Sequence, residues 1–128
     1  MSLELRDAAI AASKMAHSPY SKVNVGSALL TESGEIISGC NIENSSFGGT
    51  VCAERVAMWK AVSEGNLKWS SIYVYTKEGW SPCGFCRQVM VEFAPKNLKI
   101  IIGNEKGVET EHLLEDLLPL AFSPKDMN

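Results

Sequence analysis

Two short cysteine-containing stretches constrain what this chain can fold into. The first contains Cys52 and Glu54, and the second contains Cys83 and Cys86 in C-x-x-C spacing directly after Pro82. Three thiols in this arrangement can bind one zinc ion only if the fold brings the two stretches together. Because three protein ligands leave the fourth tetrahedral position open to water, the pattern is typical of a catalytic zinc site. We expect the rest of the chain to be the scaffold that joins the two stretches.

Glu54 gives the predicted site a chemical role. It follows Cys52 by two residues, so its carboxylate can reach a water on the metal without binding the metal itself. Zinc lowers the pKa of such a water to about 7, and a neighbouring carboxylate can then accept its proton. Arg55 and Arg87, which follow Glu54 and Cys86 directly, are expected to offset the charge of three thiolates by hydrogen bonding to sulfur.

The cysteines also allow less specific interpretations. A C-x-x-C pair alone is more often a redox pair or half of a structural zinc site, and Cys40 would close such a site as a fourth ligand. An even number of cysteines also permits two disulfides. A structural site, however, has no need of Glu54 or of Pro82 before the pair. We therefore expect Cys40 to be a core thiol at the end of a strand.

Composition and charge exclude several classes of protein. The 128 residues are 45% apolar and 21% charged, which fits one globular domain over residues 1–128. The net charge of −3 disfavours a domain that binds nucleic-acid backbones, because such domains are usually basic. No apolar run approaches the roughly 20 residues of a membrane span, and the N-terminus does not resemble a signal peptide. We expect a cytoplasmic protein with reduced thiols and no membrane partner.

Apolar periodicity predicts alternating helices and strands, and hence a mixed sheet with helices on both faces. Both cysteine stretches begin predicted helices, whose free N–H groups and partial positive charge stabilise thiolates. In such an arrangement the helices begin at the carboxyl ends of the strands, where ligands bind. The predicted helices span residues 3–16, 51–64, 81–93 and about 112–118, and the predicted strands span residues 23–31, 35–41, 71–76 and 98–102.

The combined motifs resemble those of a known enzyme family. C-x-E at Cys52 and P-C-x-x-C at Pro82 form the signature of zinc deaminases, in a version with three cysteines. The stretch Gly-Cys-Asn-Ile-Glu-Asn at residues 39–44 narrows the match to enzymes that act on nucleosides. The chain therefore resembles, over nearly its whole length, the small homotetrameric cytidine deaminases. The resemblance implies a three-layer α/β/α sandwich with a mixed five-stranded sheet.

The resemblance also assigns roles at the metal. It makes Cys52, Cys83 and Cys86 the ligands of one Zn2+ ion per subunit. It makes Glu54 the residue that moves protons, and Arg55 the cation that neutralises the thiolates.

Substrate contacts follow from the resemblance as well. Asn41 and Glu43 would hold the ribose 3′-hydroxyl, because paired polar side chains reject a substrate that lacks it. The backbones of Ala53 and Ser81 would contact the base and its departing amino group. Phe122 would reach the base bound by a neighbouring subunit. Without the resemblance, Asn41 and Glu43 would be interpreted as an ordinary solvated strand end.

Four positions depart from the family pattern. Val23 stands where these enzymes commonly have a phenylalanine that stacks on the base, and Phe47 replaces a tyrosine in the loop that subunits share. Phe85 lies inside the C-x-x-C pair where alanine is usual, and Trp80 directly precedes Ser81. These changes bear on substrate preference rather than on the zinc chemistry.

The expected reaction is hydrolytic deamination of cytidine and deoxycytidine to uridine and deoxyuridine, with release of ammonia, in pyrimidine salvage. Water attacks the amino-bearing carbon while Glu54 carries protons to the adjacent ring nitrogen and to the leaving amine. A homotetramer with active sites at subunit interfaces is implied, and the apolar side chains of Met58 and Trp59 fit such an interface.

Two kinds of alternative remain. One is a related deaminase that acts on a nucleoside analogue of the blasticidin-S type or on cytosine in single-stranded nucleic acid. The acidic charge argues against the polymer, and Asn41 with Glu43 favours a free ribose. The other is a non-catalytic zinc-binding module, against which Glu54 argues.

Overall fold

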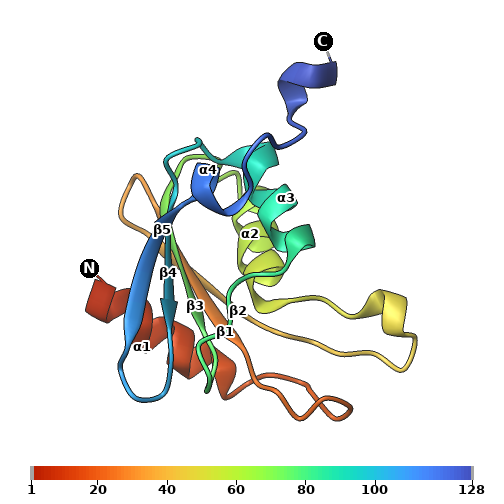
Figure 1. Ribbon diagram of the computed structural model, residues 1–128. Coiled ribbons are helices and arrows are strands. Elements are labelled where there is room, and N and C mark those ends of the chain that lie inside the picture. The colour runs from red at the N-terminus through yellow and green to blue at the C-terminus, as the bar shows by residue number, and fades with distance from the viewer. Residues whose placement is uncertain (1, 128) are drawn as a thin grey trace.

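The central sheet determines the layout of the molecule. The computed structural model describes residues 2–127 and contains a five-stranded mixed sheet with the strand order β2-β1-β3-β4-β5 (Figure 1). Neighbouring strands run antiparallel except β3 and β4, which are parallel. The mixed five-stranded sheet implied by the resemblance is thus confirmed. Its strands are β1 (Gly26–Thr31), β2 (Ile36–Cys40), β3 (Trp69–Tyr75), β4 (Lys99–Gly103) and β5 (Glu109–Leu113).

Helices cover both faces of the sheet and complete three layers. The helix α1 (Ser2–Ser13) lies on one face, and α2 (Ala53–Ser63) and α3 (Gly84–Phe93) lie on the other (Figure 1). Successive residues of a strand point to opposite faces, so Ile72 of β3 packs toward α2 and α3 while Tyr73 packs toward α1. Within residues 2–127, no helix has the length and apolar character that a membrane crossing requires.

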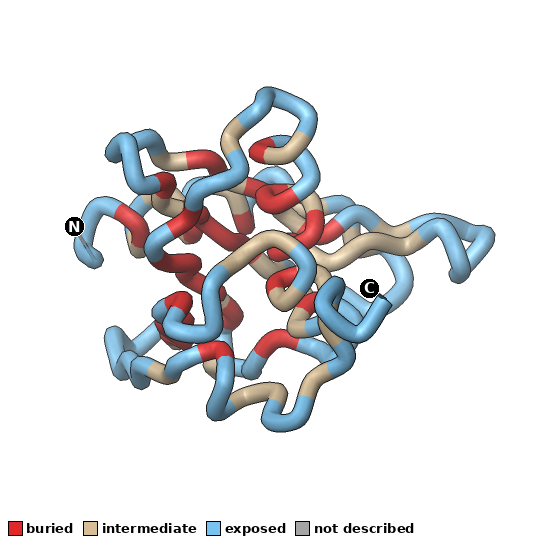
Figure 2. Tube along the Cα trace, turned by 90° about the horizontal axis from the view of Figure 1, so that it is seen from above, coloured by how far each residue is buried: buried red, intermediate tan, exposed pale blue. Residues whose placement is uncertain are grey.

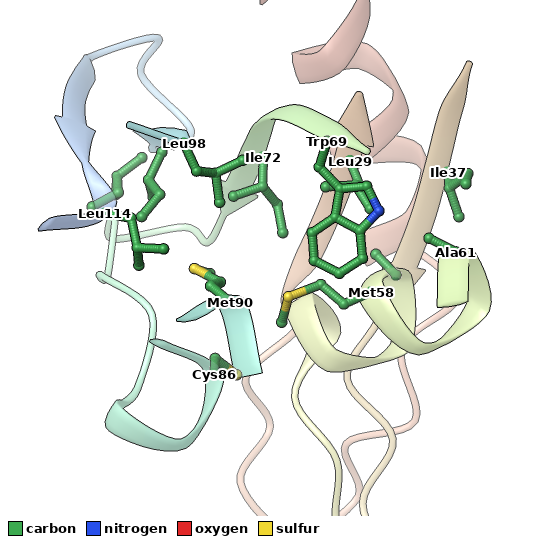
Figure 3. Packing of buried hydrophobic residues seen from close by; sticks show 13 residues of the cluster. Leu29, Ile37, Met58, Ala61, Trp69, Ile72, Cys86, Met90, Leu98 and Leu114 are labelled. Atoms are coloured by element: carbon green, nitrogen blue, oxygen red, sulfur yellow. The ribbon is translucent and has the colours of Figure 1, made fainter. Parts of the chain in front are cut away.

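The larger core lies between the sheet and the layer formed by α2 and α3. Figure 3 shows Ile72 of the sheet close to Met58 of α2 and Met90 of α3, with Trp69 in the same cluster. Figure 2 shows the buried segments gathered inside a shell of exposed ones. The expectation that Met58 lies on an apolar surface is wrong, because it points at the sheet and is fully buried. Trp59, one residue on and turned away, is 45% exposed.

The last strand is the element that the sequence does not predict. The residues after β4 predict a turn and then a helix from about residue 112, but the chain forms β5 and a short helix, α4 (Leu114–Leu117). Most side chains of β5 are exposed at the edge of the sheet, so no apolar alternation marks this strand. Its pairing with β4 rests on backbone hydrogen bonds, and charged side chains are typical of protected edges.

The helix α2 lies directly on the backbone of β2 at Gly39. A Cβ atom at this position would lie 2.6 Å from the Ala57 nitrogen and 2.7 Å from the Ala53 oxygen. Side chains do not tolerate such contacts, so only glycine allows the helix to approach the strand this closely. Since Cys52 and Glu54 lie at the start of α2, the contact also fixes where these two residues stand relative to the sheet.

We expect Gly39→Ala to lower the free energy of unfolding by about 3 kcal/mol, because the added methyl group must push α2 away from β2. Gly48→Ala is the matched control: nothing lies within 4 Å of a Cβ atom there, so its stability should stay within about 0.5 kcal/mol of wild type. Urea unfolding followed by circular dichroism measures both. Equal stability of the two variants would contradict the close approach of α2 to β2.

Candidate metal centre and active site

Three thiols meet where α2 and α3 begin. Cys52 is the N-cap residue of α2, Cys83 is the N-cap residue of α3, and Cys86 lies in the first turn of α3. The sulfur of Cys83 lies 3.7 Å from that of Cys52 and 3.5 Å from that of Cys86. A tetrahedral zinc ion with bonds of about 2.3 Å holds its sulfur ligands about 3.8 Å apart. The three sulfurs all lie within 4.8 Å of one another and therefore fit a zinc ion.

The surroundings favour negative charge on these sulfurs. Cys83 accepts a hydrogen bond from the backbone N–H of Cys86 at 3.4 Å, a thiol version of the usual N-cap contact. The pKa of Cys52 is lowered to about 5, first by a hydrogen bond from the Cys86 thiol and then by one from Arg55, whose nitrogen lies 3.3 Å from the sulfur. The pKa of Cys86 is raised, because its thiol donates to Cys52 and is buried.

Glu54 is the buried carboxylate beside the thiols. It lies in the first turn of α2 with 3% of its surface exposed, and its Oε1 atom is buried without a hydrogen-bond partner. Burial, and to a lesser extent the charge of Cys52, raises the pKa of Glu54 to about 7. An unpartnered buried carboxylate oxygen destabilises a fold, so such groups are typical of functional sites. A pKa near 7 suits a residue that must both accept and donate protons.

Cys40 lies apart from the other cysteines. It ends β2 and is half-buried, and the group of metal-ligating side chains within residues 2–127 consists of Cys52, Cys83 and Cys86 without it. The alternative of a closed four-cysteine site is therefore wrong. A site with three protein ligands leaves one tetrahedral position open for water.

Arg87 hydrogen bonds to the loop before α3 and not to a sulfur. Its guanidinium donates to the carbonyl oxygens of Pro82 at 2.8 Å and Leu117 at 2.7 Å, and to the Ser81 hydroxyl at 3.2 Å. The prediction that Arg87 hydrogen bonds to a thiolate is wrong, because its side chain points back along the loop. Ser81 lies just before α3 and Ala53 is the first residue of α2, so their backbones flank the thiols.

Asn41 is engaged with the backbone of a neighbouring segment. It is 8% exposed, its amide nitrogen donates to the Val23 carbonyl at 2.8 Å, and its oxygen accepts the Val25 N–H at 2.9 Å. Asn41 therefore holds the segment that contains Val23. One N–H of the amide remains for a ligand.

Glu43, two residues after Asn41, also holds this segment. Its carboxylate accepts hydrogen bonds from the Ser21 hydroxyl and from the backbone N–H groups of Ser21 at 3.1 Å and Tyr20 at 3.0 Å. The bond from the Ser21 hydroxyl, followed by the backbone bonds, lowers the pKa of Glu43. These positions are far apart in the sequence, and no motif indicates that Asn41 and Glu43 hold this segment.

The periphery of the chain carries the side chains of Val23, Phe47, Trp80 and Phe122. Val23 and Trp80 line one cavity of about 500 Å³ between the end of α1 and three neighbouring loops. Phe47, in the 3-10 helix η1 (Phe47–Gly49), and Phe122, near the C-terminus, are 73% and 59% exposed. Both lie on segments that extend from the body of the chain (Figure 1). One chain thus gathers the thiols and Glu54 but leaves these two aromatics at the outside.

Comparison with known proteins supports the interpretation of the site. Residues 2–102 match the family described as "Cytidine and deoxycytidylate deaminase zinc-binding region". A cytidine deaminase of Halalkalibacterium halodurans is 48% identical over 122 residues, which cover 94% of this chain and 92% of that protein. A blasticidin-S deaminase of Bacillus cereus is 38% identical over 112 residues, which cover 80% of this chain and 79% of that protein.

The fold agrees with these matches. The crystal structure of a cytidine deaminase from Burkholderia pseudomallei superposes with a TM-score of 0.92 at 39% identity, covering 95% of this chain and 99% of that chain. The matched region contains the three thiols in zinc-binding geometry and the buried Glu54. The chain belongs to the cytidine and deoxycytidylate deaminase family and carries the zinc-binding region of that family.

Proposed function

We propose that this protein is a zinc-dependent cytidine deaminase, which converts cytidine and deoxycytidine to uridine and deoxyuridine with release of ammonia. The observation that carries the proposal is the buried carboxylate of Glu54, whose Oε1 atom has no hydrogen-bond partner, beside three thiols with zinc spacing. The similarity to cytidine deaminases over nearly the whole chain supports the same reaction.

Cys52, Cys83 and Cys86 hold the zinc in this proposal. When bound, zinc supplies Lewis-acid chemistry that lowers the pKa of a water at the open position to about 7. Glu54 would take one proton from the attacking water as the water oxygen bonds to the amino-bearing carbon, and would pass it to the adjacent ring nitrogen. It would then carry the second water proton to the amine as the C–N bond breaks. Its raised pKa of about 7 lets it exchange protons in both directions.

The backbones at the starts of the two helices orient the base. The N–H of Ala53 belongs to the unpaired first turn of α2 and can donate to the base, while the backbone of Ser81 faces the departing amino group. Asn41 and Glu43 bind the ribose through the amide N–H and the carboxylate lone pairs that their internal hydrogen bonds leave free. Because both side chains are already held in place, binding the sugar costs little side-chain entropy.

A homotetramer completes the site in this proposal. Phe47 and Phe122 are largely exposed, and so is Leu120, two residues before Phe122 in the C-terminal segment. Exposed apolar side chains on extended segments are typical of surfaces that a partner covers. In the assembly, Phe122 closes over the base in a neighbouring subunit, and Phe47 and Trp59 lie at subunit contacts.

The alternatives rest on weaker observations. Similarity to the Bacillus cereus enzyme makes an analogue of the blasticidin-S type the second candidate substrate. The departure from the family pattern at Val23 bears on the choice between cytidine and this analogue. The charge of −3 disfavours single-stranded nucleic acid. A zinc site of thiolates needs reduced cysteines, which supports a role in the cytoplasm, where deamination of free nucleosides belongs to pyrimidine salvage.

We expect Glu54→Ala to lower the rate of cytidine deamination by about a thousandfold, because the variant lacks the group that moves protons. The loss of absorbance as cytidine becomes uridine and the release of ammonia both measure the reaction. The variant should keep its zinc, since Glu54 is not a ligand. If the zinc-loaded wild type turns over neither cytidine, deoxycytidine nor cytosine, the proposed function is wrong; turnover of blasticidin S alone would favour the second candidate.

Thiol labelling tests the zinc ligands independently of activity. In protein stripped of metal, iodoacetamide should modify Cys52 already at about pH 6, because its pKa of about 5 makes it a thiolate there, whereas an ordinary thiol has a pKa near 8.5. One equivalent of zinc should protect Cys52, Cys83 and Cys86 and leave the labelling of Cys40 unchanged. Peptide mass spectrometry distinguishes the four. Labelling of Cys52 that starts only near pH 8, or that zinc does not block, would contradict the assignment.

Mixing inactive chains tests whether subunits share the site. Phe122→Ala and Glu54→Ala should each lose most activity alone. In mixed tetramers some sites combine an intact Glu54 from one subunit with an intact Phe122 from its neighbour, so about a quarter of the wild-type activity should return. Chains co-expressed with two different tags provide the mixed assembly. A mixture no more active than its separate components would show that Phe122 acts within its own chain.

A further inference from the structure

Arg55 lies at a position where a positive charge is unfavourable. It lies in the first turn of α2, where the positive end of the helix dipole disfavours a cation. The side chain is also taken out of water: Arg55 is 9% exposed, and its Nε atom is buried without a hydrogen-bond partner. Hydrogen bonds to the sulfurs of Cys52, at 3.3 Å, and Cys86 explain only part of this arrangement. Something else must hold the guanidinium in place.

Two aromatic rings provide that support. The centre of the Arg55 guanidinium lies 4.0 Å from the centroid of the Phe85 ring and 5.7 Å from that of the Trp59 ring. Both distances are within the range of about 6 Å over which a cation is attracted to an aromatic face. Trp59 lies one turn further along α2, at the spacing that brings helix side chains together. Phe85 comes from α3, so its contact joins the starts of the two helices.

Phe85 is an aromatic residue outside the core. It is 59% exposed, so its ring does not fill the core. It stands between Cys83 and Cys86 in the sequence. Its ring contact with Arg55 is the shortest cation–aromatic contact in the part of the chain that the structure describes.

We propose that Phe85 is a positioning residue of the metal centre: its ring holds the Arg55 guanidinium against the Cys52 sulfur and thereby strengthens zinc binding. Three thiolates around a divalent ion carry excess negative charge, and a fixed guanidinium offsets it better than a mobile one. The same contact keeps the starts of α2 and α3 in register, on which the 3.7 Å between the sulfurs of Cys52 and Cys83 depends. This role rests on the zinc ligation proposed above.

Zinc affinity, measured by competition with a chelator, tests the role without reference to turnover. Phe85→Leu keeps an apolar side chain but loses the aromatic face, and should weaken zinc binding about tenfold, the size expected for a residue that supports a ligand. Phe85→Tyr keeps the ring and should bind zinc like wild type. Tyr75→Leu is the matched control, because it removes a ring that lies 5.7 Å from another arginine, Arg6, and should leave zinc binding unchanged.

A double-mutant cycle shows whether Phe85 acts through Arg55. In an Arg55→Gln background, Phe85→Leu should change the zinc affinity by less than about twofold, because the cation is gone. An undiminished tenfold effect in that background, an unchanged affinity of Phe85→Leu, or an equal loss in Phe85→Tyr would each overturn the proposal. The comparison of the leucine and tyrosine variants decides the question even if Arg55→Gln does not fold.

The experiment also separates this inference from the proposed function. If the wild type binds no zinc, the proposed function itself is wrong. If the wild type binds zinc and deaminates cytidine while Phe85→Leu keeps full affinity, only the positioning role is wrong.

Discussion

The chemistry of this protein depends on two helices that begin side by side at one edge of the sheet. The first turns of α2 and α3 direct unpaired N–H groups and partial positive charge toward the same point, so anionic sulfur is stabilised there before any ion binds. Each helix start is fixed by a separate contact. Gly39 lets α2 lie on the backbone of β2, and Arg87 ties down the loop that leads into α3. The sulfur spacing therefore follows from packing that lies outside the site.

The charged residues of the site are placed at the expense of stability. Glu54 and Arg55 are neighbours in one helical turn and have opposite charge, yet each has a buried polar atom without a partner. In a site selected for stability alone, each of these side chains would have a full set of partners or be replaced by an apolar residue. Instead, the carboxylate is left with one free oxygen and a raised pKa, and the guanidinium is directed to a sulfur and an aromatic ring. Such trade-offs are common where activity needs groups that folding does not favour.

Sequence patterns predict the parts of this structure that are buried on one side or on both. The strands near residues 71–76 and 98–102 and the helix near residues 51–64 match β3, β4 and α2, because apolar residues mark them. β5 carries no such mark, since this edge strand is held by backbone pairing with β4 and by polar contacts such as that of Tyr73 with Glu109, and not by buried apolar side chains. The contacts of Arg87 and the full burial of Met58 depend on side-chain direction in three dimensions, which residue type and spacing do not specify.

In the proposed assembly, the zinc site and the enclosure of the base depend on different parts of the chain. The thiols and Glu54 come from one chain and depend on two fixed helix starts, so few changes there leave the zinc site intact. In the proposed assembly, by contrast, side chains at the periphery and from neighbouring subunits would enclose the base. Val23 and Trp80 line a cavity whose lining includes neither the three thiols nor Glu54, so changes at these two positions leave the zinc ligands untouched. Phe85 belongs to neither group: it is an aromatic at the edge of the site whose contact reaches inward, through Arg55, to the metal ligands.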